Sequence, residues 1–327
     1  MKRIIIAISF LLGVILTSRA EDSAPVGKVK FLPHWLPQAQ FAGYYMAEKK
    51  GIYKKYGIDV EILKGGPEVP PFDMLNSGKT DFTTNFLATA LKAAMGGDKI
   101  VNIGQFSKKS ALVYVTKKKS GIMAPADMNG KKLGIWKSGF REVPLAFNKK
   151  YGIDMRIVPI LSTPNLFLLD GVDVMTVMWY NEYHTILNSG LDEDELTDFF
   201  FYNSELNIPE DGVYCLQKTL TERPEVCEKF IKASIEGWKY AFAHRDETIE
   251  AISGIMREAH VPANKSHQRW MLDRMNDLFT DGSSGELATR LNEESFKKTL
   301  EILSESGVSG KIDFVNFHRD CGENVEK

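Results

Sequence analysis

The sequence predicts an α/β fold of two lobes joined by two chain crossings, with a helical C-terminal segment. At 327 residues the chain exceeds the roughly 250–300 residues that one hydrophobic core supports. Short apolar runs alternate with amphipathic helical stretches, a pattern typical of sheets covered by helices. This pattern restarts near Leu133, and beyond Leu216 the chain becomes almost wholly helical. Together these observations predict two α/β units followed by helices.

In the first unit, the predicted strands are short runs rich in β-branched and aromatic residues that end at turns. They span residues 29–32, 60–63, 81–84, 100–106 and 112–116. The predicted helices have apolar residues spaced three and four apart. They cover residues 41–53, a start at 72–75, and 87–95. The alternation predicts a parallel sheet with covering helices.

The second unit repeats the pattern around one amphipathic stretch, residues 143–151. Its predicted strands span residues 133–136, 157–160, 172–178, 199–202 and 213–216. The run at 172–178 is almost unbroken in its apolar character, which is typical of a strand covered on both faces.

Four helices are predicted in the C-terminal third, at residues 224–243, 246–259, 266–279 and 293–306. They must bury their apolar faces, and packing back on the first unit achieves this. We therefore expect crossings near residues 115 and 217, giving one lobe of residues 21–115 plus 218–327 and another of 116–217. Small ligands bind in clefts between such domains, and hinge closure can switch them.

The N-terminus resembles a secretory signal peptide. A basic start is followed by the fourteen uncharged residues from Ile4 to Thr17, and then by Ser18, Arg19 and Ala20. We expect cleavage after Ala20, which lowers the formal net charge from −2 to −5 because the segment holds three basic and no acidic residues. A membrane anchor is the alternative, but it needs about 20 apolar residues. The prediction is an exported, periplasmic protein.

Composition excludes some functions. The near-zero net charge argues against a nucleic-acid partner. Cys215, Cys227 and Cys321 form no CxxC motif or cluster with histidine, so no metal or other cofactor is expected. Cys215 and Cys227 are close enough in sequence for a disulfide, and buried free thiols are the alternative.

The loop after the first predicted strand carries candidate ligand-binding residues in the first lobe. Loops at the carboxyl ends of parallel strands open onto the ligand crevice. Trp35 offers a stacking face, Gln38 and Gln40 offer donors and acceptors, and Phe41 follows them. The alternative is that Trp35 covers the core and the glutamines cap a helix. Asn85 and Phe86 also come at the carboxyl end of a predicted strand.

The second lobe has two corresponding segments. Ser138 lies between a strand and a helix, where free backbone N–H groups bind anions, although an ordinary turn also explains it. Trp179, Tyr180, Asn181 and Glu182 directly follow the apolar run at 172–178. Aromatic rings with an amide and a carboxylate are the composition expected of a small-molecule pocket.

These segments carry a family resemblance. The run from Trp35 to Tyr45 resembles the thiamine-pyrimidine-precursor (NMT1/THI5-like) periplasmic binding proteins. So do five later segments, at residues 50–60, 77–82, 180–183, 210–214 and 237–241. The resemblance covers nearly the whole mature chain and adds Tyr214 to the candidate ligand-binding residues. It implies a two-lobed type II periplasmic binding protein that delivers its ligand to the permease and ATPase of an ABC importer.

The same group includes a eukaryotic pyrimidine synthase, an enzyme that uses a lysine to hold pyridoxal phosphate, a histidine and a cysteine-rich run. In this chain Asn85 falls where that lysine is expected, and Thr89 where the histidine is expected. A Schiff base needs an amine, which Asn85 lacks. We therefore expect a binding protein and no catalytic residues.

The ligand predicted first is a heteroaromatic vitamin precursor, a thiamine-type aminopyrimidine, bound by a monomer. Trp35 and Phe41 would wall the ring from one lobe, and Trp179 and Tyr180 from the other. Its edge would be read by the polar residues Gln38, Gln40, Asn85, Asn181 and Glu182. Riboflavin is the alternative because amides also match its edge. A sulfonate or nitrate carrier, for which Arg141 is the nearest arginine, and a sensor-kinase receptor module are further alternatives.

Overall fold

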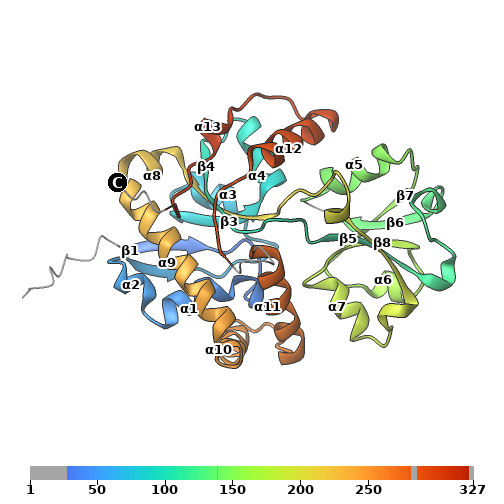
Figure 1. Ribbon diagram of the computed structural model, residues 1–327, viewed down its shortest axis with the longest axis horizontal. Coiled ribbons are helices and arrows are strands. Elements are labelled where there is room, and N and C mark those ends of the chain that lie inside the picture. The colour runs from blue at the N-terminus through green and yellow to red at the C-terminus, as the bar shows by residue number, and fades with distance from the viewer. Residues whose placement is uncertain (1–27, 138, 281–285, 324–327) are drawn as a thin grey trace, which may run out of the picture.

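The computed structural model describes residues 28–137, 139–280 and 286–323, which form two α/β lobes, each built on a five-stranded sheet. Figure 1 shows the two sheets side by side, with extended chain running between them. The export segment predicted at residues 1–20 and the candidate ligand residue Ser138 lie outside the described residues.

The first sheet has the order β2-β1-β3-β10-β4. Its strands are β1 (Lys28–Leu32), β2 (Asp59–Ile62), β3 (Phe82–Phe86), β4 (Ile100–Gln105) and β10 (Asp211–Leu216). β1 is parallel to β2 and β3, whereas β10 runs antiparallel to β3 and β4. The expectation of a parallel sheet is therefore wrong for β10, which starts at the edge where β3 ends.

The second sheet has the order β7-β6-β8-β5-β9. Its strands are β5 (Leu112–Lys117), β6 (Lys132–Trp136), β7 (Arg156–Ile160), β8 (Val174–Met178) and β9 (Leu196–Phe200). β6 is parallel to β7 and β8, and β5 is antiparallel to β8 and β9. This sheet is mixed as well.

The crossings lie earlier than the sequence predicted. β5 belongs to the second sheet and β10 to the first, so the chain crosses at residues 106–111 and returns at 201–210 rather than near 115 and 217. The reason is that sheet membership is decided by hydrogen bonds to strands distant in sequence, which the local pattern does not show. Both crossings run between the strand ends that face the opposite lobe.

The helices of the two α/β units cover their sheets. They are α1 (Ala42–Lys49), α2 (Ile52–Lys55), α3 (Pro71–Asn76), α4 (Leu87–Met95), α5 (Glu142–Lys150), α6 (Asn165–Leu168) and α7 (Glu182–Leu187). The single helix expected at 41–53 is divided because Gly51 adopts φ 67°, a left-handed conformation that ends α1 and starts α2.

The C-terminal helices pack mainly on the first lobe. They are α8 (Gln217–Glu222), α9 (Pro224–Ala243), α10 (Arg245–Glu258), α11 (Lys265–Phe279), α12 (Glu293–Glu305) and α13 (Phe314–Phe317). α9 begins at a proline in the first helical turn, where the missing N–H has no cost. α11 and α12 each begin after an asparagine whose side chain accepts backbone N–H bonds. α11 also contacts α7, and α12 contacts α5, so both helices reach the second lobe.

The core of the first lobe forms where α9 crosses the sheet. Phe230 packs against Phe31, Tyr53 and Phe82, with ring centres 4.5–5.4 Å apart. The three cysteines are buried in this lobe as free thiols. No helix within the described ranges is long and apolar enough to cross a membrane.

Candidate functional site

The loop between β1 and α1 lies at the edge of the first sheet that faces the second lobe. Its position depends on Gly65, because a Cβ there would lie only 1.9 Å from the carbonyl oxygen of Pro33. The His34 backbone N–H donates to Thr84 Oγ1 at 3.0 Å, and His34 Nδ1 lies 2.8 Å from the same hydroxyl. Burial lowers the pKa of His34 to about 3, so its ring is neutral.

Aromatic rings surround His34 on the cleft side of the first lobe. Phe41 meets the His34 ring edge-on at 5.3 Å, and Phe86 lies 4.8 Å from it. Phe86 in turn contacts Phe140 of the second lobe, with ring centres 4.8 Å apart. Asn85 is buried, and its side-chain oxygen accepts the backbone N–H of Phe86 at 2.8 Å. Phe41, Asn85 and Phe86 therefore lie in one region.

The two predicted glutamines form the start of a chain of hydrogen bonds that crosses between the lobes. Gln38 Nε2 donates to Gln40 Oε1 at 2.7 Å. Gln40 Nε2 then donates to the Tyr180 hydroxyl at 3.0 Å and to Asp211 Oδ1 at 3.1 Å. All four side chains are buried. The structure thus brings Gln38, Gln40 and Tyr180 together, and adds Asp211.

Three buried carboxyl groups, Glu182, Glu210 and Asp211, lie close enough to Tyr180 to raise the pKa of its hydroxyl, although burial is the larger cause. Glu182 accepts the Met178 backbone N–H at 3.1 Å, and the Trp136 side chain is close enough to Glu182 to lower its pKa. Across the described parts of the chain, none of the three carboxyls forms an ion pair with lysine or arginine.

The burial of these acids decides their charge. Desolvation raises the pKa of Glu182 to about 7 and that of Asp211 to about 7, the latter against the hydrogen bond from Gln40. Desolvation also raises the pKa of Glu210 to about 8, with the nearby Asp211 charge adding to it. Glu210 is fixed at the crossing by Ser110 Oγ at 2.6 Å and the Ala111 N–H at 2.8 Å.

Not every predicted site residue joins this group. Trp35 is half-buried against the first-lobe core, whereas Trp179 packs beside Phe200 and Tyr202. No ring contact joins the two tryptophans within the described chain, so the structure does not place them as facing walls of one pocket. Tyr214 is fully buried inside the first lobe, where its ring contacts Phe72 and Phe317.

Asn181 takes a different position. Its Oδ1 lies 3.1 Å from His267 Nε2 on α11, so it contacts the other lobe instead of the group around Gln40. Helix α11 also supports the first loop directly, because Gln268 Oε1 accepts the backbone N–H of Ala39 at 2.7 Å. The site thus draws on the C-terminal helices, which sequence reasoning assigned only to packing.

Four residues of this region were not predicted as site residues: His34, Trp136, Glu210 and Asp211. His34 comes shortly after β1 and Trp136 is the last residue of β6, so both lie at carboxyl ends of strands, where the rule used for Trp35 could have found them. Glu210 and Asp211 could not be found by that rule, because β10 is antiparallel and presents its amino end to the cleft.

Metal binding has no visible basis in this region. Within residues 28–137, 139–280 and 286–323, no group of three or more histidine, cysteine, aspartate or glutamate side chains is arranged to hold an ion. What the arrangement offers is a buried set of amide, hydroxyl and carboxyl groups beside aromatic rings. Such a set can accept hydrogen bonds from a flat polar solute.

Comparisons with known proteins agree with this architecture. The family model described as NMT1/THI5 like matches residues 38–248. The chain is 24% identical over 296 residues to riboflavin-binding protein RibY of Chloroflexus aurantiacus, a match covering 83% of this chain and 80% of RibY. The periplasmic aliphatic sulphonate binding protein SsuA of Escherichia coli superposes with a TM-score of 0.68 at 16% identity, covering 88% of this chain and 91% of SsuA.

Two further matches are partial. A Haemophilus influenzae protein named for thiamine biosynthesis is 29% identical over 143 residues, which cover 43% of this chain and 44% of that protein. The 4-amino-5-hydroxymethyl-2-methylpyrimidine phosphate synthase of Schizosaccharomyces pombe is 26% identical over 107 residues, covering 33% of this chain and 31% of the synthase. This chain thus spans less than half the length of either protein.

Proposed function

Because the chain belongs to the NMT1/THI5-like family and has the two-lobed periplasmic binding protein fold, we propose that it is the solute-binding component of an ABC importer. It acts in the periplasm, closes on a heteroaromatic vitamin precursor and delivers it to a membrane permease driven by an ATPase. The ligand proposed first is a thiamine-type aminopyrimidine.

The observation that carries the ligand class is the group of buried carboxyls at the cleft. Glu182, Glu210 and Asp211 have amide, hydroxyl and backbone N–H partners, and no cationic partner in the described chain. A buried carboxyl group without a cation favours a ligand that donates hydrogen bonds or carries positive charge. An aminopyrimidine has such an amine, whereas sulfonate and nitrate bring a negative charge toward these acids.

The proposal does not include catalysis. Asn85, at the position where the family's synthases are expected to have a reactive lysine, has an amide whose oxygen is bonded to the Phe86 N–H. An amide cannot form a Schiff base. Closure is favoured by a ligand that contacts both lobes, since only the closed state offers all of those contacts.

Riboflavin is the second candidate, and a specific observation favours it. The linked amides of Gln38 and Gln40 present donors and acceptors side by side, as a flavin edge requires. The similarity to RibY over most of both chains adds to this reading.

The test is isothermal titration calorimetry of the mature protein with three ligands. These are 4-amino-5-hydroxymethyl-2-methylpyrimidine, riboflavin and taurine. Tight binding of the pyrimidine alone supports the first candidate, and tight binding of riboflavin alone replaces it with the second. Taurine binding would overturn the carboxyl argument and direct attention to Arg141, whose Nε is buried without a hydrogen-bond partner in the described chain.

A further inference from the structure

Two histidine rings join the lobes on the side of the cleft where α7 meets α11. His184 of α7 and His267 of α11 place their Nδ1 atoms 3.0 Å apart. The ring planes differ by 21° and the ring centres are 5.2 Å apart, so the two nitrogens meet head-on. Because α7 belongs to the second lobe and α11 packs on the first, movement of the lobes apart would break this hydrogen bond.

A hydrogen bond between two Nδ1 atoms holds one proton between them. His267 Nε2 contacts Asn181 Oδ1 at 3.1 Å, and His184 Nδ1 is also 3.0 Å from the Asn188 amide. These amides can turn to suit either direction of the bond. In both directions one Nδ1 must remain unprotonated, because two N–H groups facing each other repel. Full protonation of both rings is therefore incompatible with the closed contact.

The surroundings of the pair do not compensate an added positive charge. The His184 ring stacks on Trp270 at 4.7 Å, and the Arg274 guanidinium lies 4.7 Å from that same indole. Among the described residues, no carboxylate bonds to either histidine. Burial lowers the pKa of His267 to about 4, with the neighbouring His184 adding to the effect, and burial lowers the pKa of His184.

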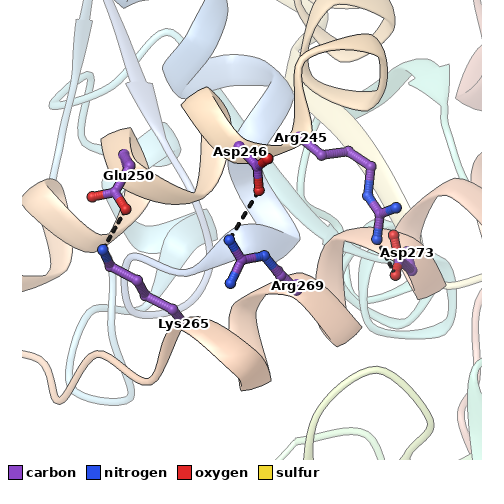
Figure 2. A network of polar contacts seen from close by, with 6 residues as sticks. All are labelled: Arg245, Asp246, Glu250, Lys265, Arg269 and Asp273. Carbon is purple, nitrogen blue, oxygen red and sulfur yellow. Dashed lines mark hydrogen bonds and ion pairs between the residues drawn. The ribbon is translucent and has the colours of Figure 1, made fainter.

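The other charged groups of the packed elements have partners of their own. On α11, Lys265 pairs with Glu250, Arg269 with Asp246, and Asp273 with Arg245, so this face is directed at α10 (Figure 2). The remaining groups are engaged as follows: Arg274 with Asp277, Asp198 with the Tyr183 hydroxyl, Lys109 over the Trp179 ring, and Glu182 with the Met178 N–H.

We propose that the His184–His267 pair is a proton-sensitive latch, so that acidification opens the lobes and weakens ligand retention. This inference rests on the proposed function only for the ligand, since the latch itself acts on lobe closure. In the open protein both rings face water, where a histidine pKa is about 6.5. A group whose pKa is lower in the closed state binds its proton better in the open state, so the closed state loses stability as the pH falls below about 6.5.

The size of the effect follows from His267. Between pH 7.5 and pH 5.5 an exposed histidine gains its proton, whereas His267 in the closed state, with a pKa of about 4, does not. The closing equilibrium therefore falls by about tenfold for this one group. Glu182, Glu210 and Asp211 act in the opposite direction, because their raised pKa values make the closed state bind protons better. The histidine contribution must therefore be measured as a difference between variants.

The first experiment follows lobe opening without ligand, by small-angle X-ray scattering of the full chain at pH 7.5 and pH 5.5. His267→Gln retains hydrogen-bonding groups but cannot take up a proton, and His184→Gln is the second variant. His244→Gln, at an exposed histidine between α9 and α10, is the matched control. We expect acidification to shift the parent and the control toward the open state about tenfold more than it shifts His267→Gln. Equal shifts in all four proteins would overturn the latch.

The second experiment measures the affinity for 4-amino-5-hydroxymethyl-2-methylpyrimidine and for riboflavin at the same two pH values. Titration of the ligand itself cancels when parent and variant are compared. The parent should lose about tenfold more affinity than His267→Gln on acidification, and an equal loss would refute the latch. If neither ligand binds at either pH, the ligand proposal fails, while the scattering result still decides the latch. Melting curves of each variant establish that it is folded.

Discussion

Replacing Gln40 with alanine tests the hydrogen-bond chain that connects the lobes. Gln40 Nε2 serves two acceptors with separate consequences, Asp211 within its own lobe and Tyr180 in the other. A bond to a charged group contributes about 1.5–3 kcal/mol, and a bond between neutral groups about 0.5–1.5 kcal/mol. At pH 8, where Asp211 is mainly ionised, Gln40→Ala should therefore lower the free energy of unfolding by about 1.5–3 kcal/mol.

The Tyr180 bond should affect ligand affinity instead, because it forms on lobe closure. Loss of this bond should weaken ligand binding by about two- to twelvefold. A double-mutant cycle of Tyr180→Phe and Gln40→Ala isolates the contribution of the Gln40–Tyr180 bond to the affinity. Urea denaturation and calorimetry measure the two quantities. Gln38→Ala is the matched control, since the Gln38 side chain bonds only to Gln40 among the described residues and its removal should cost about 1 kcal/mol. The reasoning fails if Gln40→Ala is no more destabilising than Gln38→Ala.

Three further predictions test the site and the core. Glu182→Gln should weaken aminopyrimidine binding by about 1.5–3 kcal/mol in calorimetry if the carboxylate accepts from the ligand amine, and unchanged affinity would remove Glu182 from the site. The folded protein holds the Glu210 proton up to a pKa of about 8, whereas the unfolded chain releases it at about 4.3. The contribution of Glu210 to the free energy of unfolding is therefore lost as the pH rises from about 4.3 to 8. Urea denaturation at pH 5.5 and pH 8 should therefore show a smaller loss with rising pH for Glu210→Gln than for the parent, and an equal loss would contradict this. Gly237→Ala should destabilise the fold by about 2 kcal/mol or more, because the added Cβ would lie 2.3 Å from the Gly43 carbonyl oxygen. Gly254→Ala on α10, where the added Cβ has room, should stabilise the fold by about 0.5–1 kcal/mol. Similar effects of the two substitutions would refute the packing argument.

Much of the secondary structure follows from local pattern. The helices expected at 87–95 and 224–243 have the same bounds as α4 and α9, because apolar spacing and helix-start residues are local properties. The strands were found to within a few residues. The antiparallel strands and the crossing points were not predicted, because β5 and β10 take their partners from distant parts of the chain.

The candidate site was predictable in part for a similar reason. Gln38, Gln40 and Phe41 follow a strand at its carboxyl end, and the structure buries them there, with Gln40 bonded to Tyr180 of the second lobe. Trp179 follows such a strand too, yet its ring turns toward Phe200 and Tyr202. The direction of a side chain after a strand depends on its neighbours in space, which the local sequence does not show.

The sequence by itself determined the α/β class, the family resemblance and the loops that carry polar and aromatic residues, since these depend on residue type and spacing along the chain. Only the tertiary structure decided that Glu210 and Asp211 lie beside Tyr180, and that α11 meets α7 through His267 and His184. The physical reason is that an antiparallel strand and a returning helix bring together residues far apart in sequence, and only there does burial change their charge.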